Sequence, residues 1–549
     1  MRKFFLVPLL TTLAYGAIQR GEIAVMGTVE GVVKQGSTGT PVEAIRVLLQ
    51  HRLGALQGVT DASGRFVFRD VPPGNVEVLT VQGPAGRATL TAGVALFTVS
   101  PGQQVSGLEI LVYNGGIVSG SVALPSGQPA AEVRVSAVAK SYQIDGHCVF
   151  QSVADTRTDD RGLFRISGLR PGEYFIRVQN LSPDGAQGGD ALSYTFHPGV
   201  LDPDRAEGVL VRDNQETEQV NFVVSRSIQT HLSGRVETDL PLTPSTEIHI
   251  ALRKLDGCDS IASSSARLVS SGFNGTTSAF PGRYELIASV APKSEASDSL
   301  VSLFQTRNRL VGRRSYSGRA RIDVAGPAIE SILVRVHTLS PLVGRIVTAE
   351  GSHPVPLETL GVLLVYPYET RAQYERGLIS RTQVTGQGNF TVPTYSDGKH
   401  FLFVEGLPED TYVSDIVREQ RSIYESGIEI DSSAAVVDVV VDSRGSRITG
   451  TVEDQTGKHL SSYRIILMPK TRRDNPVLYK ATTTDSRGTF VLRGIAPGDY
   501  KLFAFDNIPE NAWLNATYVA PYEESGVSVS VSPSENIANI RVRSISSGR

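Results

Sequence analysis

One short sequence recurs along the chain, and this repetition limits the fold more than any other feature. The segment TDDRGLFRISGLRPGEYFIRV begins at Thr158, and near copies begin at Thr60 (TDASGRFVFRDVPPGNVEV) and Thr484 (TDSRGTFVLRGIAPGDYKL). A chain that repeats itself in this way folds into equivalent units, each with the same local packing requirements. The first question is whether the repeated segment is a site for chemistry or a part of the scaffold.

A second pattern opens each unit: Gly-x-Val or Gly-x-Ile, with another Gly and often Pro further on. Its first glycines recur at about 90 to 115 residues, too long for a solenoid repeat and suited to a separate domain. They are Gly31, Gly120, Gly234, Gly344 and Gly450, of which the third opens a weaker copy. We predict a signal peptide at 1–17 and five modules, numbered one to five in chain order, at 25–116, 117–227, 228–339, 340–445 and 446–549.

The repeated segment has the residues of two turns and two strands. Its Asp can accept a hydrogen bond from the backbone two residues on and its Gly can take positive φ, so Thr-Asp-x-x-Gly predicts a tight turn. Phe164 and Ile166 then alternate on one face, and Tyr174 follows a second turn at Pro171-Gly172. The degenerate copies in modules three and four keep the apolar positions and lose turn residues, which favours scaffold over a catalytic motif.

Short strands separated by Gly and Pro turns fill modules of this size, and helical periodicity is nearly absent. We therefore predict an all-β protein of about five tandem antiparallel β-sandwiches, Ig-like or transthyretin-like, each with roughly seven strands. A hydrophobic content of 40% and a charged content of 20% suit folded modules rather than a disordered chain.

The first residues, MRKFFLVPLLTTLAYGA, have the layout of a secretory signal peptide. Arg2 and Lys3 precede an apolar run, and small residues follow it. No later apolar run is long enough to span a bilayer. We expect a chain that is secreted, periplasmic or at the cell surface, with no membrane insertion once the signal is removed.

The chain has two cysteines, Cys148 and Cys258, in similar contexts within adjacent modules. Export permits a disulfide between them. Equivalent loops of successive modules need not approach to the distance that a disulfide requires, so unpaired thiols are favoured and the pairing stays open. We expect packed cores, rather than disulfides, to hold this chain together.

Together these residues resemble the carboxypeptidase regulatory-like domain, a transthyretin-like or prealbumin-like sandwich that is also grouped with carbohydrate-binding-like folds. The matching motifs are Gly-x-Val, Gly-x-Pro, Thr-Asp-x-x-Gly-x-Phe and Leu-x-Pro-Gly-x-Tyr. The resemblance is good in modules one, two and five, moderate in four and weak in three, and it extends to multi-module secreted bacterial members. In metallocarboxypeptidases this domain lies beside a separate zinc-bearing catalytic domain, so the resemblance implies a regulatory module and does not by itself imply an enzyme.

Motifs for catalysis and cofactor binding are missing from the sequence. None of the nine histidines belongs to an HxxE or HExxH motif, and there is no GxSxG, P-loop or GxGxxG pattern. A formal charge of -3 gives the whole chain no attraction to nucleic acid. We expect no enzymatic activity, no cofactor, no metal and no nucleic-acid partner.

A few aromatic residues near the end of module five are candidates for a ligand patch. Sugar platforms use exposed rings, and the single Trp lies in an irregular segment with two tyrosines: Trp513, Tyr518 and Tyr522. The alternative is that these rings pack in a core, as most aromatic residues at alternating strand positions do.

A run of arginines in module three is the second candidate patch. It could bind an anionic polymer, and the alternative is a solvated hairpin whose charges protect an edge strand. The run consists of Arg307, Arg309, Arg313, Arg314, Arg319 and Arg321, of which the first four form the candidate patch.

We therefore predict an exported, non-enzymatic β-sandwich array that binds a carbohydrate or a cell-envelope protein. Two alternatives remain open: a structural spacer or adhesion rod, and a regulatory companion of a separate peptidase.

Overall fold

The computed structural model describes residues 26–51, 54–72, 74–82, 90–91, 95–99, 102–179, 194–224, 230–238, 246–258, 262–269, 272–277, 281–292, 316–366, 380–394, 396–433, 435–471, 473, 475–485 and 487–546. Nearly all of their regular structure is β-strand, which confirms the all-β fold class. The predicted signal peptide, 1–17, lies outside the described residues. Among the described residues, no helix has the length and apolar character needed to cross a membrane.

Module one has two four-stranded sheets, in the orders β4-β1-β8-β6 and β3-β2-β5-β7. Its strands are β1 (Gly27–Gln35), β2 (Arg46–His51), β3 (Gly54–Val59), β4 (Arg65–Val71), β5 (Gly74–Gln82), β6 (Leu90–Thr91), β7 (Ala95–Val99) and β8 (Gln104–Tyr113).

Module two pairs β12-β9-β16, with β17 also on β9, and β11-β10-β13-β14, with β15 also on β13. Its elements are β9 (Gly116–Ala123), β10 (Arg134–Tyr142), β11 (Cys148–Arg157), β12 (Leu163–Leu169), β13 (Gly172–Gln179), β14 (Tyr194–Phe196), the 3-10 helix η2 (Pro203–Arg205), β15 (Gly208–Val211), β16 (Glu216–Thr217) and β17 (Phe222–Val223).

Module three departs from an open sandwich, because its seven strands close on themselves in the order β18-β21-β20-β19-β22-β23-β24. They are β18 (Thr230–Thr238), β19 (Thr246–Lys254), β20 (Ala262–Val269), β21 (Gly272–Thr277), β22 (Gly282–Pro292), β23 (Tyr316–Val324) and β24 (Ala328–Thr338).

Module four has the sheets β28-β25-β33-β30-β31 and β27-β26-β29-β32. Its elements are β25 (Leu342–Thr348), η3 (Leu357–Thr359), β26 (Gly361–Val365), β27 (Ser380–Gln383), β28 (Asn389–Val392), β29 (Gly398–Glu405), β30 (Tyr412–Arg418), β31 (Arg421–Ser422), β32 (Ile428–Ile430) and β33 (Val436–Asp442).

Module five joins its strands in the order β36-β35-β38-β40-β34-β37, with β39 on β38. Its elements are β34 (Ser446–Glu453), β35 (Arg464–Pro469), η4 (Pro476–Leu478), β36 (Lys480–Thr483), β37 (Thr489–Ile495), β38 (Gly498–Phe505), η5 (Ala512–Leu514), α3 (Ala516–Val519), η6 (Ala520–Ser525), β39 (Val527–Val531) and β40 (Asn536–Ile545).

The first and last strands of every module run parallel, the one regular departure from the antiparallel pattern. These pairs are β1 with β8, β9 with β16 and β17, β18 with β24, β25 with β33, and β34 with β40. In module three, whose seven strands alternate in direction along the chain, the first and seventh strands point the same way and so pair in parallel where they meet.

The opening glycine of the Gly-x-Val pattern lies where the last strand comes closest. A Cβ on Gly120 would lie 2.0 Å from the carbonyl oxygen of Val220, and one on Gly450 would lie 2.2 Å from that of Ile540. The residues before these two carbonyls, Gln219 and Asn539, have φ of 63° and 61°. A bulge in the last strand thus pushes its backbone into the space that any side chain would fill.

Each module buries a core of its own. The five cores are drawn from residues 29–112, 118–224, 232–336, 339–441 and 448–542, with Leu478 of module five added to the fourth. In module two, Phe164, Ile166 and Tyr174 are at most 6% exposed. The alternating positions of the repeated segment therefore face the core, as their pattern predicts.

One sheet in module two and one in module five are also buried on the outer face. In module two, Phe150 and Phe175 pack with Phe196 of β14 on the side away from the core. In module five, Phe503 and Phe505 pack with Trp513 of the segment between β38 and β39. Each segment that follows the Pro-Gly-x-Tyr strand thus folds back as a cover over that strand's second face.

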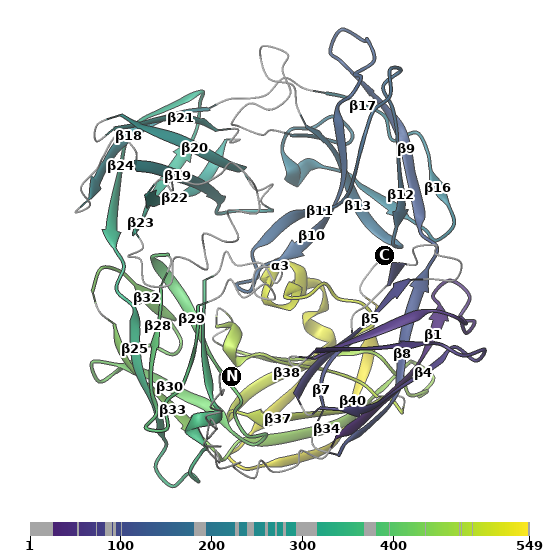
Figure 1. Ribbon diagram of the computed structural model, residues 1–549, viewed down its shortest axis with the longest axis vertical. Helices are drawn as coiled ribbons and strands as arrows, with labels where there is room; N and C mark the ends of the chain where they lie inside the picture. Colours follow the sequence, from purple (N-terminus) through teal and green to yellow (C-terminus); the bar gives the residue numbers. More distant parts are fainter. Residues whose placement is uncertain are drawn as a thin grey trace, which may run out of the picture.

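The modules follow one another around a closed ring (Figure 1). Modules two and three lie at the top of this view, module four at the lower left and module five at the bottom, while module one lies at the right. Hydrogen bonds join module five back to module two: the side-chain amide nitrogens of Asn511 and Asn515 donate to the carbonyl oxygens of Tyr142 and Gly146, at 3.3 and 2.8 Å. The chain therefore returns on itself rather than extending as a rod.

Modules two and three are joined covalently, which corrects the expectation of unpaired cysteines. Cys148, the first residue of β11, forms a disulfide with Cys258, and their Cα atoms lie 4.5 Å apart. Lys254 lies between Asp202 and Asp204, with its Nζ 3.5 and 2.5 Å from their carboxylates. The two loops meet because this ion cluster and the aromatic cover of module two draw module three onto module two, a packing that no local sequence pattern encodes.

The remaining joints are polar or apolar contacts between neighbours. Between modules one and two, Gln35 donates to Asp213 at 3.0 Å. Between modules four and five, Asn475 donates to the carbonyl oxygen of Tyr424 at 2.5 Å, and Leu478 packs into the core of module four.

Candidate functional site

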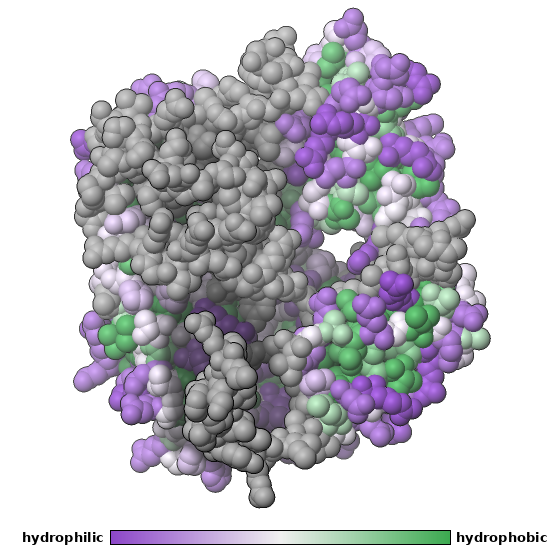
Figure 2. Space-filling model, viewed as in Figure 1, coloured by the Kyte–Doolittle hydropathy of each residue, from purple (hydrophilic) through white to green (hydrophobic). Residues whose placement is uncertain are grey.

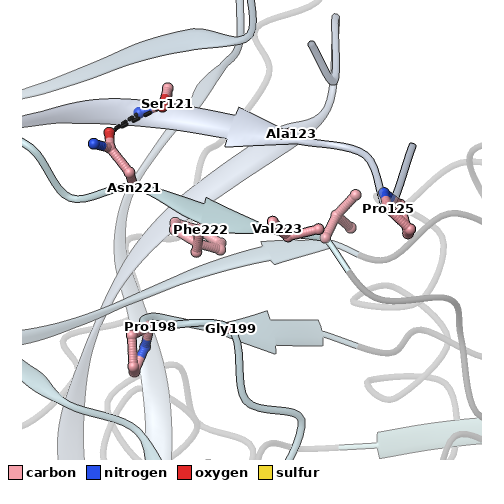
Figure 3. Close-up of a pocket in the computed structure, with 9 residues that line it drawn as sticks. Ser121, Ala123, Pro125, Pro198, Gly199, Asn221, Phe222 and Val223 are labelled. Carbon is pink, nitrogen blue, oxygen red and sulfur yellow. Dashed lines mark hydrogen bonds between the residues drawn. The ribbon is translucent and has the colours of Figure 1, made fainter. Parts of the chain in front are cut away.

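A shallow groove on module two is the candidate site for a ligand (Figure 3). Its volume is 680 Å³. It lies between β9 and β17 of one sheet and the turn that follows β14 of the other. The lining residues are Ser121, Ala123, Pro125, Pro198, Gly199, Asn221, Phe222, Val223 and Val224.

Two polar residues of the lining, Ser121 and Asn221, are hydrogen-bonded to each other. The Oδ1 atom of Asn221 accepts hydrogen bonds from both the backbone N–H and the hydroxyl of Ser121, each at 2.9 Å. This arrangement orients the amide, so its NH2 group points away from Ser121 (Figure 3).

Apolar groups form the rest of the groove. Val223 is 48% exposed, whereas the ring of Phe222 is buried and meets His197 edge-on at 6.0 Å. Burial lowers the pKa of His197. None of the nine lining residues has an ionisable side chain, and the polar groups that they offer are the Ser121 hydroxyl and the Asn221 amide.

The splitting of the last strand builds this groove. In module two this strand is divided into β16 and β17, each of two residues, around Gln219 with its positive φ. The other described last strands have seven to eleven residues. The sequence indicates this divided strand only weakly, because RDNQETEQVNFVV at 212–224 alternates poorly between apolar and polar residues.

The predicted aromatic patch of module five is largely internal. Trp513 is 6% exposed, and Tyr518 and Tyr522 are half-buried against the same cluster. Arg464 lies over the Trp513 ring at 5.4 Å, and the ring of Tyr518 meets that of Tyr142 in module two at 5.5 Å. The three rings therefore cover a sheet and form a module joint, rather than an exposed sugar platform.

The predicted arginine patch, Arg307, Arg309, Arg313 and Arg314, lies entirely outside the described residues. Two further arginines of the run are described. Arg321 lies on β23, and Arg319 is held in the joint between modules three and four.

Arg319 is the centre of that joint. Its guanidinium lies 3.2 Å from Glu285 of its own module and 3.1 Å from Asp397 of module four, and it lies over the Tyr366 ring at 4.9 Å. A Cβ on Gly398 would lie 2.5 Å from the guanidinium carbon, so the guanidinium packs directly against the backbone of this glycine. The contacts of Arg319 are thus internal.

Two histidines near module joints are kept neutral by their surroundings. Burial lowers the pKa of His400, beside Tyr366, to about 4. Burial, with Arg253 nearby, also lowers the pKa of His147 to about 4. Within the described ranges, no group of three or more His, Cys, Asp or Glu side chains is arranged to hold a metal ion.

Comparison with known proteins gives no family assignment. No family model matches the chain, and no curated protein matches it.

Solved structures that resemble parts of the chain are bacterial proteins of low identity. The TIE protein of Bacillus anthracis is 12% identical over 57% of this chain and 51% of its own, with a TM-score of 0.16. This chain thus covers about half of that protein. The minor pilin GBS52 of Streptococcus agalactiae is 15% identical over 36% of this chain and 96% of its own, with a TM-score of 0.20. The major pilin BcpA of Bacillus cereus is 10% identical over 57% and 99%, with a TM-score of 0.14. At these TM-scores we draw no argument from them, and the fold class rests on the strand pairing.

Proposed function

We propose that this chain is an exported, non-enzymatic binding protein that contacts a carbohydrate or a cell-envelope protein through the groove of module two. The observation that carries the proposal is the composition of the groove: an oriented amide and a hydroxyl among apolar residues, with no ionisable side chain. Such a lining suits recognition, which relies on shape and a few placed polar groups.

Two further observations support the location and the manner of binding. A disulfide between modules forms and persists in oxidising compartments, which suits a chain outside the cytoplasm. Contacts at the described joints close the modules into a ring, so the groove belongs to a preorganised surface that does not need to be ordered on binding.

A binding experiment with two matched variants tests the proposal. The chain lacking residues 1–17 is applied to a glycan array and to solubilised cell-envelope fractions. Val223→Lys places a charge in the groove, and Val153→Lys places the same charge at another exposed valine of module two, 51% exposed. We expect binding by the wild-type chain and by Val153→Lys, with at least a tenfold loss for Val223→Lys, about 1.4 kcal/mol.

Three outcomes would contradict parts of the proposal. Equal binding by both variants would exclude the groove as the binding site. If the chain bound to no glycan and to no cell-envelope fraction, a structural role for the ring would remain. Peptide hydrolysis by the zinc-loaded chain would contradict the non-enzymatic assignment. A variant with Arg307, Arg309, Arg313 and Arg314 changed to Gln, run in the same assay, tests the predicted anionic-polymer patch.

The structural alternative is a spacer that holds other partners apart. The link from module five to module two opposes an extended rod and allows a closed spacer. Small-angle scattering separates these forms, because five modules in a line have a much larger maximum dimension than a ring of modules two to five with module one attached. The third alternative, a regulatory companion of a separate peptidase, stays a prediction of the family resemblance.

A further inference from the structure

A single hairpin tip in module two carries the contacts to both module three and module five. This tip, residues 142–148, joins β10 to β11, and Tyr142 pairs with Cys148 across it. It is tightly folded, since Gln143 donates its backbone N–H to the carbonyl oxygen of His147 at 2.9 Å and Asp145 accepts from the N–H of His147 at 3.0 Å. We call it the junction hairpin.

Module three holds the junction hairpin by one covalent bond and one ion pair. Cys148 is bonded to Cys258, and Asp145 is paired with Arg253, with both side chains at most 17% exposed. A second ion cluster supports the joint, where the N–H of Cys258 donates to Asp204 at 2.9 Å. Apart from the disulfide, these polar contacts of the joint all involve charged groups.

Module five holds the same hairpin by neutral contacts. Asn515 donates to the carbonyl oxygen of Gly146 at 2.8 Å, Asn511 donates to that of Tyr142 at 3.3 Å, and the ring of Tyr518 meets that of Tyr142. The fit is close, because a Cβ on Gly146 would lie 2.4 Å from the carbonyl oxygen of Leu514. A small displacement of the hairpin would separate these groups.

The contact between modules five and two closes a ring. The fraction of molecules in which this contact is formed therefore depends on how rigid the other joints of the ring are. The contacts described between the two modules, which are two amide hydrogen bonds, one ring contact and the packing of Gly146 against Leu514, form a smaller interface than separate proteins use to associate stably. These contacts persist because the chain holds module five near module two, at a high effective concentration. That effective concentration falls once a joint of the ring becomes free to move. The disulfide fixes the joint between modules two and three.

We propose that the Cys148–Cys258 disulfide is a redox-controlled latch, which keeps module five docked on module two and whose reduction opens the ring. Cys258 is half-buried whereas Cys148 is 5% exposed, so the thiolate of a dithiol reductant attacks the sulfur of Cys258 and Cys148 leaves as a thiolate. The second thiol of the reductant then displaces Cys258. The dithiol is oxidised to a disulfide, and the protein gains two thiols.

Hydrogen exchange of the whole chain measures this coupling at residues 511–525 of module five. This segment contains no cysteine, so the reductant does not alter it directly. The chain lacking residues 1–17 is compared before and after reduction with dithiothreitol, at low salt and at about 0.5 M sodium chloride, where ion pairs are screened. We expect hydrogen exchange of residues 511–525 to accelerate at least about tenfold on reduction in high salt. The reason is that this segment exchanges when the contact between modules five and two opens, and reduction lowers the free energy of that opening. The radius of gyration from scattering should rise in the same sample, and the fluorescence of Trp513, the single Trp, should change.

Two variants separate the latch from simple loss of structure. Asn511→Asp with Asn515→Asp removes the two amide donors to the junction hairpin and keeps the disulfide and the side-chain oxygen at position 515 that caps α3, so it should give fast exchange and a larger radius in both redox states. Cys148→Ser with Cys258→Ser should match the reduced chain without a reductant. If that variant fails to fold, reduction of the already folded wild-type chain remains decisive. Unchanged exchange at 511–525 and an unchanged radius after complete reduction would overturn the proposal.

Discussion

The hydroxyl of Thr158 accepts a hydrogen bond from the backbone N–H of Val133 at 3.0 Å, across 25 residues of sequence. The same hydroxyl donates to the carbonyl oxygen of Ala130 at 2.5 Å, and Thr158 is 1% exposed. Thr60 in module one and Thr484 in module five make the same pair of bonds to their own preceding loops. The Thr of the repeated segment is therefore a buried clamp between two turns.

Replacing this hydroxyl by a methyl group should destabilise module two. Thr158→Val keeps the shape of the side chain but leaves the N–H of Val133 and the carbonyl of Ala130 buried without this partner. We expect the free energy of unfolding of module two to fall by about 1 to 3 kcal/mol. Urea unfolding followed by hydrogen exchange in β10 and β12 measures it, and an unchanged value would show that the clamp contributes nothing.

The neighbouring Asp159 should act as a turn former and not as a ligand site. Its Oδ1 atom accepts from the N–H of Arg161 at 2.9 Å and of Leu163 at 2.8 Å, beside Gly162 with φ of 74°. Asp159→Ala should lower the melting temperature of module two, whereas Asp160→Ala, one residue on, should leave it unchanged. Lost ligand binding by Asp159→Ala at unchanged stability would instead make it a site residue.

The opening glycine of module four should not tolerate a side chain. A Cβ on Gly344 would lie 2.2 Å from the Cζ atom of Phe390 and 2.8 Å from the carbonyl oxygen of Val437. We expect Gly344→Ala to destabilise module four by about 1 to 3 kcal/mol, the usual effect of overpacking. Gly386→Ala is the control, because nothing lies within 4 Å of its Cβ. Equal denaturation midpoints for both variants would contradict the close approach.

His400 should make the stability of module four depend on pH. Burial lowers its pKa to about 4, from the ordinary value of 6.5, so the unfolded chain binds more protons than the folded chain between these two values. The free energy of unfolding should therefore be highest above about pH 6.5 and fall by about 1 to 3 kcal/mol towards pH 4.

A matched pair of substitutions checks this pH dependence. His400→Phe keeps a ring against Tyr366 and should flatten the pH profile of β29 hydrogen exchange, while His353→Phe, at an exposed position, should keep the wild-type profile. A steep profile that survives His400→Phe would assign the dependence to other groups.

The local chemistry of the repeats was predictable from particular residues. Asp159 and Gly162 predict a turn, and the alternation of Phe164 and Ile166 predicts the core face of a strand. Both predictions were possible because turns and strand alternation depend on neighbouring residues alone. The sequence also contained the clue to the last-strand bulge, since Gly recurs at the same place in five copies. The sequence did not show the reason for the glycine, because the carbonyl that excludes a side chain lies 77 to 100 residues away.

The candidate sites were harder to predict, since they depend on where modules meet. Trp513 lies in an irregular segment that could have been a surface loop, and it became a cover because the outer face of β38 also carries phenylalanines. The groove of module two depends on a break in one strand and on a turn of the other sheet, so no contiguous motif describes it.

The sequence by itself determined that this protein is built of repeated β modules, because turn residues and alternating apolar positions act over a few residues. Only the tertiary structure decided the Cys148–Cys258 bond and the docking of Asn511 and Asn515 on the junction hairpin. Those contacts join residues 110 to 369 positions apart, and such pairs come together only after complete modules have packed against one another.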